Sequence, residues 1–169
     1  MADRPAPVDA IMMRAGLGFD LHPLAHGRPL VLGGVTVPAE RGLDGHSDAD
    51  VLTHAISEAM LGALALGDLG QLFPDTDPRY AGVSSLLLLQ AVMDLIATKG
   101  AHLVNVDATV ICQSPRLGPY LGEMAKRLAA TLRLEVDRVS VKAKSPEHLG
   151  LIGREEGIAA MAVVTVEAR

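Results

Sequence analysis

Three residues in the first third of the chain have the types and spacing of a metal site. Asp20 and His22 are separated by one residue in a stretch that we expect to be extended. Alternate residues of a strand project to the same face, so these two side chains should point the same way. His54 lies inside a pattern typical of a helix. Two histidines and one carboxylate are a common ligand set for catalytic zinc, which keeps its fourth position open.

The spacing alone leaves simpler explanations of these residues open. Asp-x-His is a short pattern that also occurs without a metal, and a single histidine is more often a packed or exposed residue. Asp50 and Glu58 share a helical stripe with His54, so either could accept a hydrogen bond from its second ring nitrogen. For Glu58 a solvated polar stripe is the simpler interpretation.

Polar residues also cluster where that helix should begin. Ser47 and Asp50 resemble a capping box, with Ser47 as the N-cap and Asp50 at N3. The free N–H groups and the dipole at a helix N-terminus favour an anion, and His46 could donate a hydrogen bond to a phosphate there. Plain capping and anion binding are both compatible with this composition.

Other polar residues lie in loops whose composition is ambiguous. Asp68, Asp75 and Asp77 fall in a segment rich in proline and aspartate, for which turn formation is the simpler explanation. Glu147 could hold magnesium, which prefers oxygen ligands. Arg154 could bind a phosphate through two hydrogen bonds or be merely exposed.

Strand and helix patterns alternate along the chain. Strands are predicted at residues 13–22, 103–112, 139–143 and 158–166, and a hairpin at 28–38 with its tight turn at Gly33-Gly34. Helices are predicted from Ser47 to about Gly67, from Ser84 or Ser85 to Lys99, and over residues 119–132, with a charged connection at residues 39–45. This alternation predicts an α/β or α+β sheet with helices covering one face.

Composition narrows the class of protein. The 169 residues suit one domain over 13–169, preceded by a flexible extension at 1–12 that lacks the apolar core of a signal peptide. A net charge of −5, the absence of a basic run and only two Phe and two Tyr disfavour nucleic-acid binding. No apolar run approaches the roughly 18 residues of a membrane span. The single cysteine, Cys112, fits a reducing compartment, so we expect a cytoplasmic protein.

Seven segments form a joint pattern that is more specific than any one of them: Gly18–His22, Gly33–Val35, His46–His54, Gly67–Gly70, Leu72–Asp77, Asn105–Asp107 and Gly150–Gly157. Together, over essentially residues 13–169, they resemble the 2-C-methyl-D-erythritol 2,4-cyclodiphosphate synthase family. The resemblance implies intramolecular phosphoryl transfer in non-mevalonate isoprenoid biosynthesis. In that reaction 4-diphosphocytidyl-2-C-methyl-D-erythritol 2-phosphate cyclises to 2-C-methyl-D-erythritol 2,4-cyclodiphosphate and releases CMP.

The resemblance also implies metal ligands. Asp20, His22 and His54 are expected to bind zinc, and Glu147 to hold a magnesium or manganese ion that bridges the diphosphate. Phosphoryl transfer depends mainly on positioning and on neutralising negative charge, which two divalent cations would supply. Such a pair would also let a chain of net charge −5 take a strongly anionic substrate.

Catalytic and substrate contacts follow from the same resemblance. His46 and Ser145 are expected to act on the phosphoryl groups, with Ser145 keeping a hydroxyl where the family often has threonine, and Lys144 adding a cation. The expected substrate contacts, including a cytosine pocket, are Ser47, Asp68, Leu69, Gly70, Phe73, Pro74, Asp75, Thr76, Asp77, Cys112, Pro115, Arg116, Leu117, Gly118, Ala143, Lys144, Leu151 and Arg154.

The family implies an assembly as well. Its members are homotrimers of ferredoxin-like sandwiches with active sites between subunits. Phe19 should point away from Asp20, toward an apolar cavity on the three-fold axis. Arg154 matches a residue near that cavity, where Met161 replaces an acidic residue found in some members.

Two other functions are compatible with the same ligands. A zinc hydrolase would activate water at Asp20, His22 and His54 and would need a general base near the metal. A metal- or nucleotide-binding module would carry the site without turnover.

Overall fold

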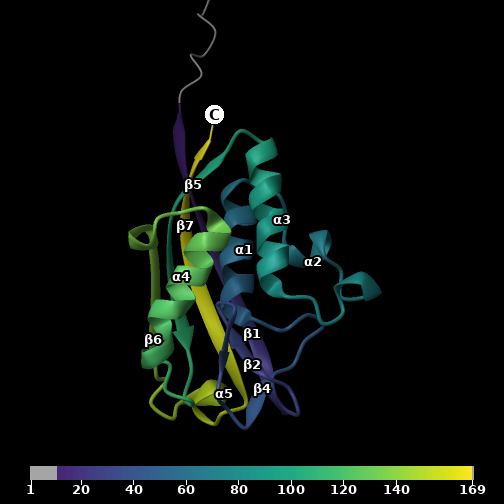
Figure 1. The fold of residues 1–169 in the computed structure, drawn as a ribbon, viewed down its shortest axis with the longest axis vertical. Helices are drawn as coiled ribbons and strands as arrows, with labels where there is room; N and C mark the ends of the chain where they lie inside the picture. Colours follow the sequence, from purple (N-terminus) through teal and green to yellow (C-terminus); the bar gives the residue numbers. More distant parts are fainter. Residues whose placement is uncertain (1–10, 169) are drawn as a thin grey trace, which may run out of the picture.

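A five-stranded mixed sheet, with helices on one of its faces, forms the body of the molecule (Figure 1). The computed structural model describes residues 11–168, so most of the extension predicted at 1–12 lies outside the described residues. In spatial order the strands are β4 (Arg41–Leu43), β1 (Met12–His26), β7 (Gly157–Ala168), β5 (His102–Ile111) and β6 (Val139–Lys144). β5 and β6 are parallel, and the other neighbours are antiparallel.

The helices form a second layer. The α-helices are α1 (Val51–Ala63), α2 (Leu69–Leu72), α3 (Ser85–Thr98), α4 (Leu121–Leu132) and α5 (Gly150–Gly153). Short 3-10 turns lie at Pro78–Tyr80, Gly118–Tyr120 and Val136–Arg138. Helix α1 packs along β1 and β7, α4 packs on β6, and α3 contacts both helices. The predicted mixed α/β class is confirmed.

The hairpin predicted at 28–38 forms a separate two-stranded sheet, β2 (Leu30–Leu32) and β3 (Val35–Val37). Gly33 and Gly34 connect the strands with φ values of 55° and 72°, as the turn requires. The connection predicted at residues 39–45 was only partly right, because it contains β4, which pairs with the end of β1.

The contact between β1 and α1 depends on two glycines. A Cβ atom on Gly16 would lie 1.9 Å from the carbonyl oxygen of Ala59, and one on Gly18 would lie 1.9 Å from that of Ala55. The strand therefore lies against the backbone of the helix at both points. This close approach places the next residues of β1 beside the first turn of α1, where His54 lies.

The other face of the sheet carries exposed apolar side chains. On β1, Leu17 and Phe19 are 63% and 55% exposed, and on β7 their partners Val163 and Met161 are 46% and 42% exposed. The alternation along β1 explains this, because Gly16 and Gly18 face the helices and the residues between them face away. The prediction that Phe19 points away from Asp20 is confirmed.

The start of α1 differs from the prediction. Asp50, not Ser47, is the N-cap, and its carboxylate accepts hydrogen bonds from the N–H of Thr53 and from the turn N–H groups of Gly33 and Gly34. Gly33 and Gly34 are distant from Asp50 in sequence, so a capping pattern cannot reveal these hydrogen bonds. The helix also ends at Ala63 rather than near Gly67.

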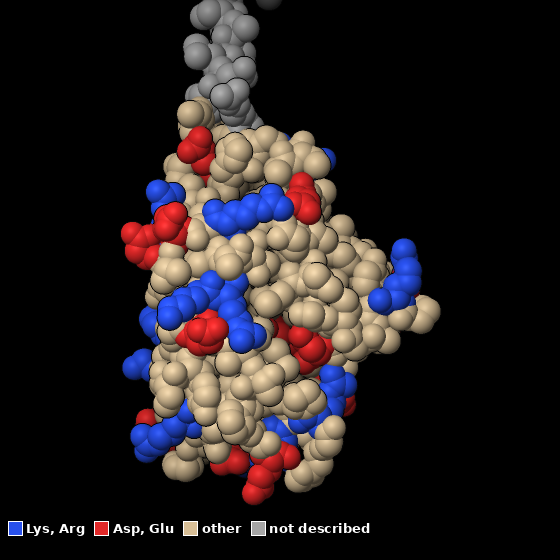
Figure 2. Space-filling view, in the orientation of Figure 1, with Lys and Arg blue, Asp and Glu red and all other residues tan. Residues whose placement is uncertain are grey.

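Charges of both signs are mixed on one face of the molecule. Figure 2 shows lysines and arginines interspersed with aspartates and glutamates on the face it presents, with no continuous basic field. Between residues 11 and 168, the structure contains no helix that is both long enough and apolar enough to cross a membrane.

Candidate metal centre and adjoining cavities

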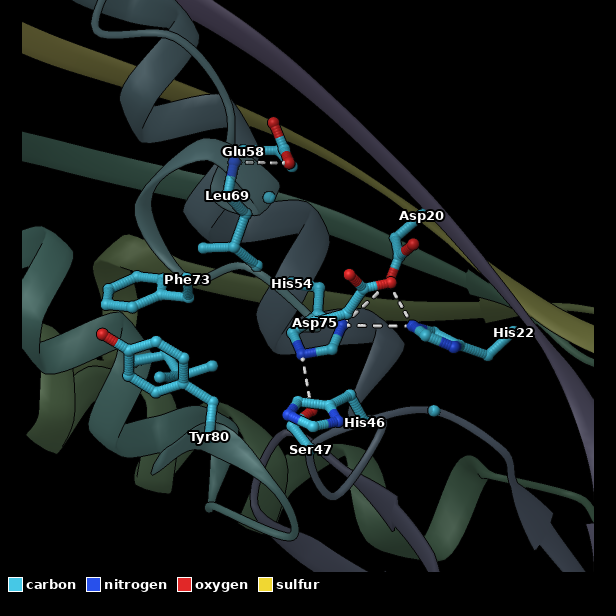
Figure 3. A pocket seen from close by; sticks show the side chains of 13 residues that line it. Asp20, His22, His46, Ser47, His54, Glu58, Leu69, Phe73, Asp75 and Tyr80 are labelled. Carbon is cyan, nitrogen blue, oxygen red and sulfur yellow. Dashed lines mark hydrogen bonds and ion pairs between the residues drawn. The ribbon is translucent and has the colours of Figure 1, made fainter. Parts of the chain in front are cut away.

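The three predicted ligands converge at one point between β1 and α1 (Figure 3). Asp20 Oδ2 lies 3.0 Å from His22 Nε2 and 2.9 Å from His54 Nδ1, and the two ring nitrogens are 3.3 Å apart. All three ligand atoms lie within 4.8 Å of one another, so a single ion would reach each of them. Two imidazoles and one carboxylate suit zinc or another divalent transition metal.

The backbone orients two of these ligands. The N–H of Leu21 donates to Asp20 Oδ1 at 2.9 Å, which leaves Oδ2 directed at the histidines. His22 Nδ1 lies 2.8 Å from the carbonyl oxygen of Asp44. Because a carbonyl only accepts, Nδ1 carries the hydrogen, and Nε2 is the nitrogen that would bind a metal.

Without a metal ion, the cluster favours a proton on His22. Burial alone would raise the pKa of Asp20, but hydrogen bonds to His22 and His54 outweigh it and hold that pKa well below its ordinary value. Burial would lower the pKa of His22, yet the hydrogen bond and the negative charge of Asp20 raise it above its ordinary value. A metal ion must therefore displace a proton that Asp20 stabilises on His22.

This competition predicts how metal stabilisation depends on pH. The raised pKa of His22 stabilises the metal-free fold at low pH, and that contribution is lost as pH rises through the folded-state pKa. Asp20, whose pKa is lowered in the folded state, contributes its full stabilisation of the fold above about pH 4. We therefore expect the zinc-induced rise in Tm to be larger at pH 8 than at pH 6, as measured by calorimetry with zinc or with a chelator. A rise that is smaller at pH 8 would contradict this coupling.

The acceptors predicted for the second nitrogen of His54 were wrong. His54 Nε2 lies 2.8 Å from Ser85 Oγ and 3.2 Å from Ser47 Oγ. Asp50 is occupied at the helix cap, and burial raises its pKa against the effect of its hydrogen bonds. Glu58 instead accepts a hydrogen bond from the N–H of Leu69 at 2.9 Å, so it anchors α2 rather than forming a solvated stripe.

A cavity of about 340 Å³ opens over the metal cluster. Of the predicted substrate-binding and catalytic residues it brings together His46, Ser47, Leu69, Gly70, Phe73 and Asp75, with Tyr80 and Glu58 as additional lining residues (Figure 3). The ring of Tyr80 packs edge-on against Phe73 at 5.3 Å. His46 Nε2 donates to the carbonyl oxygen of Asp77 at 2.9 Å, so only its Nδ1 is left to meet a ligand.

A second cavity, of about 550 Å³, lies where β5 and β6 end. It brings together the other predicted group: Cys112, Pro115, Arg116, Leu117, Gly118, Ala143, Lys144, Ser145 and Glu147. Burial raises the pKa of the Cys112 thiol to about 11, so this sulfur is a packed group rather than a reactive thiolate. The metal cluster is not part of its lining, so one chain carries the predicted residues in two separate cavities.

The loop that carries Glu147 is held by hydrogen bonds from its neighbours. The N–H of Glu147 donates to Ser145 Oγ at 3.0 Å, and the N–H of His148 donates to Gln113 Oε1 at 3.0 Å. Glu147 and His148 both adopt positive φ, at 53° and 62°, which costs energy for residues with a side chain. His148 also lines this cavity and was not predicted, because a single loop histidine carries no distinctive pattern.

The remaining predicted residues line neither cavity. These are Asp68, Pro74, Thr76, Asp77, Leu151 and Arg154. Asp68 caps α2 through the N–H of Gln71, and Asp77 pairs with Arg79, so both have the turn roles that composition favoured. Arg154 is exposed and pairs with Glu156 at 2.6 Å.

Comparison with known proteins identifies the family of this chain. Residues 13–167 match the YgbB family. The chain belongs to the YgbB family. The resemblance to the cyclodiphosphate synthase family is confirmed by the relatives that match this chain. Among YgbB relatives named 2-C-methyl-D-erythritol 2,4-cyclodiphosphate synthase, that of Geobacter metallireducens is 59% identical over 157 residues, covering 93% of this chain and 100% of the relative. That of Syntrophobacter fumaroxidans is 56% identical over 152 residues, covering 90% and 96%.

Similar solved structures share the fold. The bifunctional IspDF from Campylobacter jejuni has a TM-score of 0.91 and 41% identity, and the match covers 95% of this chain but only 43% of that protein. A 2C-methyl-D-erythritol-2,4-cyclodiphosphate synthase described as the bound form with CDP has a TM-score of 0.82 and 39% identity, covering 89% of this chain and 98% of that one.

Proposed function

We propose that this chain is a 2-C-methyl-D-erythritol 2,4-cyclodiphosphate synthase. It would convert 4-diphosphocytidyl-2-C-methyl-D-erythritol 2-phosphate to the 2,4-cyclodiphosphate and CMP. The observation that carries the proposal is the convergence of Asp20, His22 and His54 under a cavity, in a chain 59% identical over 157 residues to a synthase of that name. As a metal-dependent lyase of isoprenoid biosynthesis, the protein would need both cavities for one substrate.

The donor set fits the proposed zinc. Its two imidazole nitrogens and one carboxylate oxygen lie in the lining of the cavity, and as three protein ligands they would leave one position of a tetrahedral ion open to a ligand. When bound, zinc would supply positive charge against the phosphoryl oxygens. The role of the chain is then to hold the reacting groups in line. Phe73 and Tyr80 offer an apolar wall, while His46 and Ser47 offer polar atoms at the cavity edge.

We assign the nucleotide and the second metal to the other cavity. Glu147 would hold magnesium or manganese through its carboxylate, an oxygen ligand of the kind those ions prefer. Ser145, Lys144 and Arg116 lie in the same lining and would meet the diphosphate. The proposed contacts of Asp68, Pro74, Thr76, Asp77, Leu151 and Arg154 require a ligand, or a neighbouring chain, that extends beyond these two linings.

The separation of the cavities supports a homotrimer with active sites between subunits. If the metal cavity of one subunit faces the nucleotide cavity of the next, the substrate can span both. The exposed apolar row on β1 and β7 that includes Phe19 and Met161 is a suitable buried face for such an assembly. Light scattering should then give three times the 17.7 kDa of one chain, whereas a monomer would contradict the shared site.

The proposal also includes the type of fold, the domain bounds and the location in the cell. The layer of helices on one face of a mixed sheet supports a ferredoxin-like sandwich. Residues 13–169 would form one catalytic domain, after a flexible extension at 1–12. The single cysteine supports a cytoplasmic location.

Turnover of the proposed substrate tests the function directly. Incubation with zinc and magnesium, followed by ³¹P NMR, should show cyclic diphosphate together with CMP. A linear hydrolysis product would support the zinc hydrolase instead. Zinc binding with no turnover would leave the metal- or nucleotide-binding module. The His22→Ala variant serves as the metal-deficient control in the same assay.

Glu147→Gln should weaken the second metal while leaving zinc in place. The amide keeps the size of the side chain but removes the negative charge that attracts a hard cation. We expect the magnesium concentration for half-maximal activity to rise by about tenfold or more, a loss of roughly 1.4 kcal/mol in binding. Titration of activity with magnesium, with the zinc content measured in parallel, checks this. An unchanged magnesium titration would contradict the role of Glu147.

A further inference from the structure

The side of His54 that faces away from the metal cluster is enclosed by hydroxyl groups. Its Nε2 lies 2.8 Å from Ser85 Oγ, at the first residue of α3, and 3.2 Å from Ser47 Oγ. Ser85 is fully buried, and Ser47 and His54 are 7% and 8% exposed. Water therefore cannot readily replace these partners, and an N–H left here without an acceptor would be costly.

The direction of these hydrogen bonds follows from Asp48. Ser85 Oγ contacts Asp48 Oδ1, and the N–H of Ser85 donates to Asp48 Oδ2 at 3.1 Å. A carboxylate only accepts, so the Ser85 hydroxyl donates its hydrogen to Asp48 and its oxygen is free to accept from His54 Nε2–H. When a metal ion is bound, the hydrogen of His54 is thus assigned to Nε2. Nδ1, the ring nitrogen that lies next to Asp20 Oδ2 and His22 Nε2, is then the atom that would bind the ion.

We propose that Asp48 and Ser85 are positioning residues of the metal site, linked to His54 as a chain from carboxylate to hydroxyl to imidazole. These linked hydrogen bonds fix the tautomer and the ring orientation of His54 and raise the electron density at Nδ1. It resembles the carboxylate–histidine pairing of many metal sites, with a serine hydroxyl inserted between the two groups. The proposal rests on the metal site proposed above, and not on the identity of the substrate.

The other two ligands make His54 the informative case. Asp20 and His22 are oriented by main-chain groups of Leu21 and Asp44, which substitutions other than proline leave in place. Among the described residues, His54 is the ligand whose outer nitrogen is held only by side chains. The segments that carry Asp48 and Ser85 are also joined by their main chains, because the N–H of Asp48 donates to the carbonyl of Val83 at 3.0 Å, beside the start of α3.

Zinc affinity of Ser85→Ala, measured by chelator competition, tests the proposal. Loss of a hydrogen-bonding partner of a metal-bound histidine typically weakens metal affinity about 10–100-fold, and we expect a loss in that range. Ser84→Ala is the matched control, because the Ser84 side chain makes no capping hydrogen bond at the start of α3. Cobalt-substituted Ser85→Ala should also show a shifted ligand-field spectrum, whereas Ser84→Ala should match the wild type. Equal zinc affinity in the two variants would overturn the proposal.

Two further measurements keep the test decisive if Ser85→Ala folds poorly. Asp48→Asn keeps the size of the side chain but accepts more weakly, so it should lower zinc affinity in the same direction and by less. In the zinc-loaded wild type, ¹H–¹⁵N NMR of the imidazoles should show His54 with its hydrogen on Nε2. A hydrogen on Nδ1 would overturn the assignment. Because none of these measurements uses turnover, absence of cyclase activity would refute the proposed function while leaving this inference intact.

Discussion

His22→Ala is expected to lose stoichiometric zinc and, with it, almost all turnover. The substitution removes one of three protein ligands, and the remaining Asp20 and His54 form an incomplete set for a tetrahedral ion. Metal stabilisation of phosphoryl charge is worth several kcal/mol, so the rate should fall by more than about 1,000-fold. Zinc content by mass spectrometry of the metals and turnover by product analysis measure the two effects.

His26→Ala provides the matched control for this variant. It removes an exposed histidine from the same strand, four residues beyond His22 and outside the cavity over the cluster. Its zinc content and turnover should equal those of the wild type. Retention of one zinc per chain in both His22→Ala and Asp20→Ala would refute the ligand assignment, whatever their activity.

Gly18→Ala is expected to destabilise the fold by more than about 3 kcal/mol, at the upper end of the cost of overpacking. The new Cβ atom would lie 1.9 Å from the carbonyl oxygen of Ala55 and 2.6 Å from the nitrogen of Ala59. Both are main-chain atoms of α1, so no side-chain rotation relieves the clash. Separation of the strand from the helix would also move Asp20 away from His54, and zinc affinity should fall with stability.

Gly62→Ala, in the same helix, separates this clash from the general effect of a glycine substitution. Its Cβ atom would meet only the carbonyl oxygen of Leu17, at 3.9 Å, so the substitution should stabilise α1 by up to about 1 kcal/mol. Urea denaturation of both variants measures the difference. A Gly18→Ala midpoint equal to that of the wild type would show that β1 and α1 are not in main-chain contact.

Local patterns were sufficient for part of this molecule. The period of two along β1 placed Asp20 and His22 on one side and Phe19 on the other, and all three have those positions. The alternation of strand and helix patterns predicted the mixed fold. These features depend on neighbouring residues alone, because strand and helix periods decide which side chains share a face.

Local patterns did not predict hydrogen bonds between residues that are distant in sequence. Asp50 was predicted at the third position of a helix cap, but it is the N-cap itself, and its carboxylate also accepts from the N–H groups of Gly33 and Gly34. Ser85 was predicted as a possible cap of its own helix, yet its hydroxyl contacts Asp48 and His54. Short polar side chains can satisfy either a local turn or a remote donor, and the sequence does not say which is nearby.

The metal centre itself combines both kinds of information. Residue types and a spacing of two determined that Asp20 and His22 could bind one ion, since that geometry is a property of any extended strand. Only the packing of Gly16 and Gly18 against the backbone of α1 decided that His54 lies within 2.9 Å of Asp20. The tertiary structure likewise decided that the second group of predicted residues lies in a separate cavity. That separation arises because the ends of β5 and β6, not β1 and α1, position those side chains.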